Sequence, residues 1–429
     1  MVHMTTSPQF HVPADYPSLT AAVAAATPVY GTVVLAPGLY RVTSTVRVGA
    51  GMRLMGSSAE DTIIESSAQT TVACADGALG VSDVCIQQVD SGVLEPVFGL
   101  ELRGGTTVER CRIRAACRAR NAAGVLARTA TAMPTLNQCI VDGCGYAGMI
   151  LAAGASASLS GCTLRGCGGG GVLVLQGCSL KALTSTIAGC AESAMTVGGK
   201  ATADLRECTL SDNGGTGGVP TASFKAGSRG ILRGCRVLDG RGVGIQLAEE
   251  SDCEVEGCTV LRSAKAGVAA KAPRRLVVAR SEVGEGGAAG VMLLHGGRGT
   301  TLSDNTIRGN AKSAIQLSGS ADPLVEGNQI LDGMGPGIFA FDGARGSFVR
   351  NLIRGGVVRG RPPHTPQTPR FCRQCYSPSS RLALGLIGRP MPPSLRHPCH
   401  AAMPPCHPHR AAPIVPPLSC RLDVLLPAS

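Results

Sequence analysis

The sequence predicts an all-β solenoid whose chain winds into stacked coils of three short strands each. Three observations predict this fold. A ladder position that holds Cys, Ser or Asn recurs about every 23 residues, an apolar-x-apolar triplet follows nine residues later, and Gly-rich turns separate the segments. The alternating triplets have the period of β-strands. Three strands within about 23 residues match one coil of a parallel β-helix, whose coils stack about 4.8 Å apart.

The ladder consists of Cys, Ser or Asn, then any residue, then Ile, Leu or Val. Its spacings are 28, 23, 23, 23, 27, 23, 23, 24, 23 and 23 residues, and the two long intervals indicate loop insertions, one of them around 214–219. A small side chain suits a sharp inward turn, and stacked Asn residues also bond to one another. We therefore interpret these cysteines as stacked core residues, with redox or metal roles as the alternative. The ladder positions are Cys111, Cys139, Cys162, Ser185, Cys208, Cys235, Cys258, Ser281, Asn305, Asn328 and Asn351.

The N-terminal segment predicts a cap for the first coil. Residues 20–26 are Ala-rich and predict a short helix, which would cover the open end of the sheets. Residues 31–40 predict a strand that leads into a Pro-Gly turn, and residues 42–48, 52–55 and 62–65 predict further strands. The expected organisation is a disordered N-terminus over 1–9, a β-helix over 10–358 and a disordered Pro/Arg-rich tail over 359–429.

Composition limits the functional classes. Residues 361–429 hold eight Arg, no Lys, one Asp and 16 of the 27 Pro, so the basic charge comes from a segment that predicts disorder. We therefore expect no specific nucleic-acid binding. The sequence shows neither a membrane-length apolar run nor a secretory signal, so we expect a cytoplasmic protein without membrane contact. Cys372, Cys375, Cys399 and His400 in the tail match no compact zinc finger, and we expect no metal or other cofactor.

Several motifs resemble a known superfamily. VPADYPSLTAAVAAA at 12–26, VVLAPGLYRV at 33–42 and the G-I-x-L and N-x-I coils resemble the right-handed single-stranded parallel β-helix, or pectin-lyase-like, superfamily with its carbohydrate-binding and sugar-hydrolase type repeats. The resemblance implies that fold over about 10–358. It does not select a function, because the superfamily contains lyases, esterases, epimerases, phage spikes and non-enzymatic modules.

The resemblance also implies that a site would lie on outward-facing residues of the G-I-x-L strands. The x positions from Ile150 upward carry no ionisable side chain, whereas hydrolases need paired carboxylates and lyases need a base beside a cation. An apolar strip along a solenoid instead favours a partner surface. The predicted binding surface is Ile150, Leu173, Gln246, Met292, Gln316 and Phe339.

Two polar groups near the ends of these strands are the catalytic candidates. His295 and Asp342 occupy equivalent positions two coils apart, and exposed turn polarity is the alternative interpretation. A second pattern joins Asp212, Asp239, Glu285 and Asp332 in one turn register. This acidic stripe is a conceivable cation site, but Arg262 interrupts it.

The sequence thus predicts a non-catalytic interaction module that binds a partner, foremost a protein, along one solenoid face. The alternative is a diverged carbohydrate-active enzyme or a polysaccharide-binding protein of the lyase, esterase or epimerase type. A purely structural rod is the third possibility. The expected partner is accordingly a protein or a polysaccharide.

Overall fold

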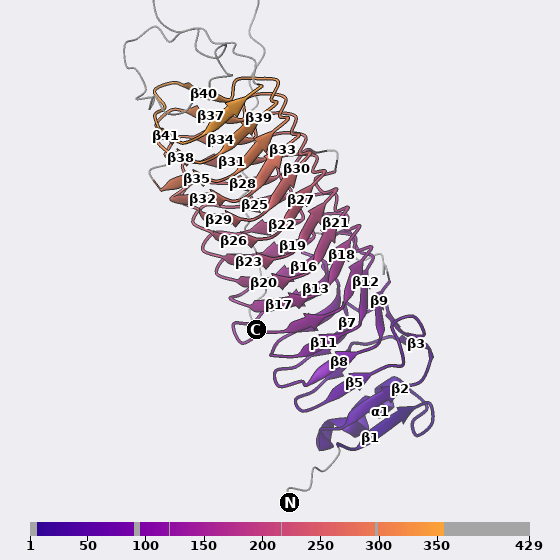
Figure 1. The fold of residues 1–429 in the computed structure, drawn as a ribbon. Coiled ribbons are helices and arrows are strands. Elements are labelled where there is room, and N and C mark those ends of the chain that lie inside the picture. The colour runs from indigo at the N-terminus through magenta and orange to yellow at the C-terminus, as the bar shows by residue number, and fades with distance from the viewer. Residues whose placement is uncertain (1–6, 90–94, 120, 216, 297–298, 356–429) are drawn as a thin grey trace, which may run out of the picture. The chain divides into compact units, whose positions relative to one another are not determined.

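The computed structural model describes residues 7–89, 95–119, 121–215, 217–296 and 299–355. They form a parallel β-helix of about 15 turns with one short α-helix at its N-terminal end (Figure 1). Each turn of the chain adds one strand to each of three sheets. This confirms the predicted all-β solenoid. The predicted tail over 359–429 lies outside the described residues.

Sheet A has 15 strands and precedes the ladder position in each coil. Neighbouring strands pair in parallel, as β17 and β20 do from Ser156↔Ser179 to Ser160↔Leu183. The strands are β1 Gln9–Val12, β2 Thr32–Leu35, β5 Arg53–Met55, β8 Gly80–Ser82, β11 Thr107–Glu109, β14 Thr135–Asn137, β17 Ser156–Ser160, β20 Ser179–Leu183, β23 Thr202–Arg206, β26 Arg229–Arg233, β29 Asp252–Glu256, β32 Arg275–Ala279, β35 Thr300–Ser303, β38 Leu324–Glu326 and β41 Ser347–Val349.

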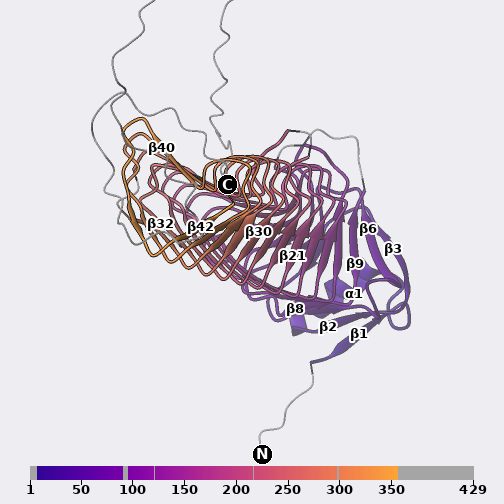
Figure 2. The ribbon, with the colours of Figure 1, turned by 45° about the horizontal axis from the view of Figure 1, so that its top comes forward.

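Sheet B has 14 strands and follows the ladder position (Figure 2). The strands are β3 Gly38–Val42, β6 Thr62–Ser66, β9 Cys85–Gln88, β12 Arg112–Ala115, β15 Ile140–Asp142, β18 Thr163–Arg165, β21 Thr186–Ala188, β24 Thr209–Ser211, β27 Arg236–Leu238, β30 Thr259–Leu261, β33 Glu282–Gly284, β36 Thr306–Arg308, β39 Gln329–Leu331 and β42 Leu352–Arg354.

Sheet C has 13 strands and contains the G-I-x-L segments. The strands are β4 Val46–Val48, β7 Thr70–Cys74, β10 Phe98–Leu102, β13 Ala123–Ala127, β16 Ala147–Leu151, β19 Val172–Val174, β22 Met195–Val197, β25 Ala222–Phe224, β28 Ile245–Leu247, β31 Val268–Lys271, β34 Val291–Leu294, β37 Ile315–Ser318 and β40 Ile338–Phe341. One strand prediction was wrong: residues 42–48 are the end of β3, a break and β4, because the chain there turns from sheet B into sheet C.

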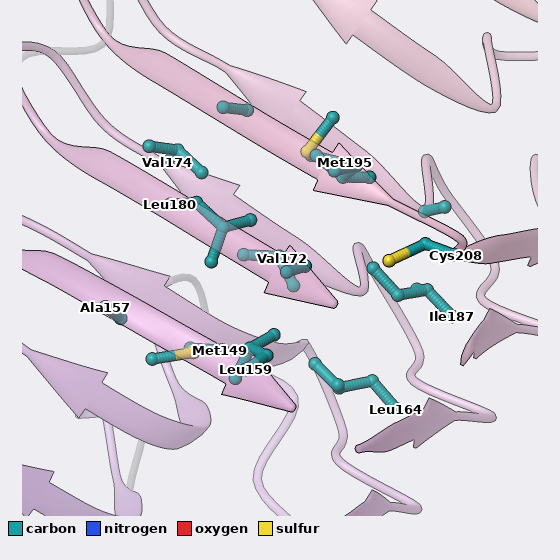
Figure 3. Close-up of a cluster of buried hydrophobic side chains, with 14 of the residues drawn as sticks. Met149, Ala157, Leu159, Leu164, Val172, Val174, Leu180, Ile187, Met195 and Cys208 are labelled. Carbon is teal, nitrogen blue, oxygen red and sulfur yellow. The ribbon is translucent and has the colours of Figure 1, made fainter. Parts of the chain in front are cut away.

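The core runs through the middle of the coils. Inward side chains of the three sheets meet there in one continuous apolar cluster, and Met149, Val172 and Met195 stack in one column (Figure 3). In many coils a Gly directly precedes the strand of sheet C, and the reason is steric. A Cβ at Gly148 would lie 2.7 Å from the carbonyl oxygen of Gly171, so a side chain there would force neighbouring coils apart.

The ladder lies at the turn from sheet A to sheet B, as predicted. Its cysteines are buried, and Cys139 Sγ lies 3.3 Å from the carbonyl oxygen of Asn137. The residue before each ladder position has a positive φ, for example 53° at Gln138, which makes the turn sharp. The described cysteines are free, and the ladder is core packing.

The capping helix is also confirmed. α1 covers Leu19–Ala26 and is followed by a 3₁₀ turn, η1, at Thr27–Val29. Ser18 Oγ accepts a 3.2 Å hydrogen bond from the Ala21 amide, a standard N-cap. Leu19, Ala22 and Ala26 are buried in the core cluster beside the first coil, which closes that end of the apolar interior (Figures 1 and 2). Among the described residues, no helix has the length and apolar character to cross a membrane.

Candidate functional site

The predicted binding surface forms one outward column of sheet C. Strand register places Ile150 opposite Leu173, and it places Met292, Gln316 and Phe339 on successive strands. The column is not uniformly exposed, since Ile150 is only 3% exposed whereas Phe339 is 38% exposed and Gln246 is exposed as well. Thr196, Ser223 and Gln246 interrupt its apolar character at mid-length. The apolar positions therefore fall into two separate groups.

The lower group belongs to an apolar cluster on the outside of sheet C. Phe98, Leu126 and Ile150 are buried there, together with Ala123 and Ala147. Tyr146, Ala152, Leu173 and Leu175 pack against them from the same side. Ile150 and Leu173 thus contribute to packing.

The two catalytic candidates lie in turns after sheet C. His295 and Asp342 are exposed and both have a φ of 57°. The coil of Gly319 separates them, and the His295 ring packs where a side chain at Gly319 would stand. Within the described residues, no hydrogen bond or ion pair joins them. The structure confirms their shared register but does not bring them into contact, so their catalytic role stays a prediction.

Two of the four acidic residues in the stripe, Asp239 and Glu285, pair with arginines. Asp212, Asp239, Glu285 and Asp332 do share one left-handed turn register. Arg262 Nε donates to Asp239 over 2.6 Å, and Arg308 Nη1 donates to Glu285 over 2.7 Å. Within the described ranges, no group of three or more His, Cys, Asp or Glu side chains is arranged to hold a metal ion.

Two ionisable x positions, Arg47 and Glu101, lie below the part of the column that the sequence prediction covered. Glu101 lies in the same outward column as Leu126 and Ile150, four coils below Thr196. It is 5% exposed and accepts hydrogen bonds from Arg103 Nε over 2.7 Å and from Arg128 Nε over 3.0 Å. The F-G-L-E-L segment at 98–102 has the pattern of the later coils, so extending the column below Ile150 would have found it.

A second charged cluster lies on the outer face of sheet B. Asp142 at the end of β15 accepts a hydrogen bond from Arg112 Nε over 3.1 Å and one from Arg114 Nε over 2.9 Å. Arg165, on the next strand, lies opposite Asp142 with Nη2 at 3.5 Å from Oδ2. The side chain of Asp142 is only 10% exposed. One carboxylate on β15 thus holds three guanidinium groups, two from β12 and one from β18.

These arginines were not predicted as site residues. Each occupies an outward position of the short strand after the ladder, in the segments C-R-I-R and C-T-L-R, and Asp142 occupies such a position in C-I-V-D. Polar side chains are expected at outward strand positions. A detectable signal was the alternation of Arg114, Asp142 and Arg165 at one repeat position.

The arginine environment sets the protonation state of Asp142. Burial acts to raise the pKa of this carboxyl group, but hydrogen bonds from Arg112 and Arg114 outweigh burial and lower the pKa to about 2. Asp142 is therefore ionised at neutral pH. A general acid needs the opposite shift, which makes this carboxylate an anchor for the arginines.

A groove crosses the ends of β9, β12, β15 and β18, where sheet B turns toward sheet C. Its first part, the Gln88 end, has a volume of about 370 Å³ and is lined by Gln87, Gln88, Val89, Arg114, Ala116, Asp142 and Gly143. Its second part, the glycine end, has a volume of about 460 Å³ and shares Ala116 and Gly143. The remaining lining residues of the glycine end are Arg118, Cys144, Gly145, Gly166 and Gly168. We call the two parts together the corner groove.

Similarity to solved structures lies in the fold. The catalytic unit of the GH87 α-1,3-glucanase from Streptomyces thermodiastaticus aligns with 77% of this chain at 15% identity and a TM-score of 0.49, and the chain spans 64% of that unit. The Dettilon tailspike protein aligns with 81% of the chain at 11% identity and a TM-score of 0.48, over 66% of its own length. The A-module of the Azotobacter vinelandii mannuronan C-5 epimerase AlgE4 aligns with 80% at 14% identity and a TM-score of 0.34, over 94% of the module.

A search among curated proteins gives no match. A sequence family described as "right handed beta helix region" matches residues 98–226 and 221–360, together more than half of the chain. The matched segments contain the ladder, most strands of the three sheets and the groove residues from Arg114 onward, whereas Gln87, Gln88 and Val89 lie before them. The chain belongs to the right-handed β-helix family.

Proposed function

We propose that this β-helix binds a polysaccharide chain in the corner groove. The observation that carries the proposal is the repeated polar track at this corner. The groove crosses successive coils, which stack about 4.8 Å apart, and presents equivalent positions of each coil to the ligand. A polymer of similar units suits such a track better than a compact molecule does.

The lining of the groove supports sugar recognition. At the glycine end, Gly143, Gly145, Gly166 and Gly168 leave peptide groups uncovered by side chains. At the Gln88 end, amide, guanidinium and carboxylate groups converge within the same groove. A few placed polar groups of this kind fix the orientation of a hydroxyl-rich ligand.

We propose binding of the polysaccharide, and whether the protein also cleaves or modifies it is a separate measurement. Asp142 is ionised and held by arginines, which is unlike the proton donor of a glycoside hydrolase. Lyase, esterase or epimerase activity is therefore a separate outcome, to be measured on the same glycans as binding.

The test uses the full chain and a bulky side chain in the groove. Ala116 is exposed and borders both parts of the groove, so Ala116→Trp should fill it without disturbing the core. Ala311→Trp is the matched control, because Ala311 is also exposed in a turn but lies several coils away. The panel contains pectate, methylated pectin, alginate, sulfated glycans and dextran, each measured for binding and turnover.

We expect wild type and Ala311→Trp to bind the same glycan, and Ala116→Trp to bind it at least about tenfold more weakly. Equal binding by all three proteins would contradict the proposal, as would the absence of binding to every glycan. Turnover that Ala116→Trp leaves unchanged would place a catalytic site elsewhere on the solenoid.

Protein binding along sheet C is a second candidate, favoured by one observation. Phe339 and Phe341 on β40 are 38% and 39% exposed and stack with their ring centroids 5.1 Å apart. Exposed aromatic pairs are common anchors of protein interfaces. Phe339→Asp should abolish a stoichiometric protein contact that Leu324→Asp, at an equally exposed position on sheet A, preserves. Loss in both variants, or in neither, would remove this candidate.

A further inference from the structure

We infer that the Gln88 end of the corner groove is a subsite for an acidic sugar, which binds a carboxylate or sulfate group and a hydroxyl of the same unit. This inference rests on the proposed function and specifies the class of polysaccharide. Two features of the Gln88 end support the inference: an excess of positive charge, and a buried hydrogen-bond acceptor that has no partner among the described residues.

The first argument is charge. Arg112, Arg114 and Arg165 surround the single carboxylate of Asp142, and Arg118 lines the glycine end of the groove. Glu60 is the next acidic group that acts on Arg112. Counted over the described residues, the cluster thus keeps at least two uncompensated positive charges beside the groove. Guanidinium groups are well suited to bind carboxylate and sulfate oxygens.

The second argument is the orientation of Arg114. Asp142 occupies its Nε, and among the described residues this is the only hydrogen bond that Arg114 donates. Its two terminal nitrogens donate to none of the described residues, and the side chain lines the groove at 39% exposure. Because Asp142 fixes the guanidinium before a ligand arrives, less conformational freedom is lost on binding.

The third argument is Gln88. It is only 1% exposed and lines the same end of the groove. Its Nε2 donates to the carbonyl oxygen of Val89, whereas its Oε1 is buried without a hydrogen-bond partner among the described residues. A buried acceptor without a partner is costly, so it favours a ligand that supplies a donor. A sugar hydroxyl is such a donor, and a bare sulfate ion is not.

The two requirements together select the ligand class. Arg114 requires an oxyanion, and Gln88 requires a hydroxyl close to it. Uronic acid units and sulfated sugars carry both groups on one ring. None of the described residues that line the groove is aromatic, so nucleic-acid bases have no ring to stack on, although their phosphates would match the charge.

The charge test uses a position that tolerates a side chain. Gly143 has a φ of 60°, and a Cβ there would meet no atom within 4 Å. Equivalent turns already hold Asp212 and Asp239 at φ values of 57° and 56°, so an Asp at this position matches the fold. Gly143→Asp adds a carboxylate to the groove, Gly143→Asn is its neutral counterpart, and Gly189→Asp adds the same charge one coil beyond the groove.

The measurement is titration calorimetry of the full chain with polygalacturonate, dextran sulfate, dextran, inorganic sulfate and single-stranded DNA. We expect the two acidic glycans to bind more tightly than dextran, and Gly143→Asp to weaken their binding about tenfold or more. Gly189→Asp should stay within about twofold of wild type, and Gly143→Asn should weaken binding clearly less than Gly143→Asp does. Preference between polygalacturonate and dextran sulfate identifies the carboxylate or the sulfate as the recognised group.

Gln88→Leu tests the acceptor separately. Because removing the unpaired Oε1 offsets the lost hydrogen bond from Nε2 to Val89, this variant should keep about the wild-type melting temperature while it weakens binding of the acidic glycans. A lowered melting temperature with unchanged affinity would show a purely structural role and overturn this part of the inference.

The remaining outcomes separate the two proposals. If dextran binds as tightly as the acidic glycans, and if Gly143→Asp and Gly143→Asn change glycan affinity equally, the acidic subsite is overturned. Polysaccharide binding in the groove then still stands. Absence of binding to every glycan overturns both. If DNA or inorganic sulfate binds as tightly as the acidic glycans, and Gly143→Asp weakens that binding to the same extent, the assignment to a sugar is overturned.

Discussion

Arg114 Nε donates a 2.9 Å hydrogen bond to the carboxylate of Asp142, which lies one coil further along the outer face of sheet B. The contact joins residues 28 positions apart in the sequence. It links two successive coils at the edge of the corner groove. The same carboxylate also binds Arg112, so its ionisation affects both the stability of these coils and the presentation of the arginines.

The low pKa of Asp142 predicts a pH-dependent contribution to stability. A pKa lowered from 3.8 to about 2 stabilises the fold by about 2 kcal/mol at pH values above the unfolded pKa. This contribution is lost as the pH falls through about 4 to 2. Asp142→Asn should therefore melt at a lower temperature than wild type at pH 7, and the difference should shrink between pH 4 and 2. A difference that is constant over this range would contradict the predicted ionisation.

The asparagine part of the ladder predicts a graded loss of stability. Asn328 is fully buried, donates from Nδ2 to Asn351 Oδ1 over 2.9 Å and accepts from Asn305 Nδ2 over 2.9 Å. Asn328→Ala leaves these groups unpaired and should cost about 1–3 kcal/mol in free energy of unfolding. Asn328→Ser should cost less, because Ser281 fills the same position and accepts from the Cys258 amide. Urea denaturation measures both, and equal losses would show that only side-chain volume matters.

The core predicts a coupled pair of substitutions. A Cβ at Gly230 would lie 2.4 Å from the ring of Phe224, which is fully buried. Gly230→Ala should lower the free energy of unfolding by about 1–3 kcal/mol through overpacking. Phe224→Leu should also destabilise, by leaving a cavity. Combined, the two changes should be less harmful than their sum, with a coupling of at least about 0.5 kcal/mol. Additive effects would mean that the coil relaxes to admit the methyl group.

The stacked thiols predict low reactivity in the native protein. Burial, with a smaller contribution from Glu101, raises the pKa of Cys74 to about 12, and Cys139, stacked on Cys111, also has its pKa raised to about 12. Such thiols are protonated at pH 8 and hidden from reagents. Iodoacetamide should label the fourteen described cysteines only after denaturation, as mass spectrometry of peptides would show. Rapid labelling of Cys139 in the native protein would contradict the interpretation that the ladder is buried core packing.

The repeat made the fold predictable, but the first coils carry a weaker sequence signal at the ladder position. Ladder positions from Cys111 onward are small, buried and regularly spaced, so one tripeptide located the turn in each coil. The coil before Cys111 holds Val84 at this position, after Asp83 with a φ of 57°. A branched apolar residue fits the same turn but carries no distinctive sequence signal. The N-terminal coils therefore had to be recognised from the strands alone.

The candidate site was harder to predict because it depends on stacking. Arg114, Asp142 and Arg165 are ordinary outward residues in their own coils and become a cluster only when successive strands align. Gln88 appears as a polar strand residue, and the strand pattern does not indicate that it is only 1% exposed. The predicted surface column was correct in register, but register does not show that Ile150 is covered and Phe339 is not.

The most direct test of polysaccharide binding at the corner groove is amide hydrogen exchange of the full chain, with and without saturating polygalacturonate. We predict slower exchange in the turns at 87–89, 116–118, 143–145 and 166–168, with no change in the equivalent turns at 309–312 and 332–335. Protection confined to the outer face of sheet C, or to the turns of His295 and Asp342, would contradict the groove as the binding site.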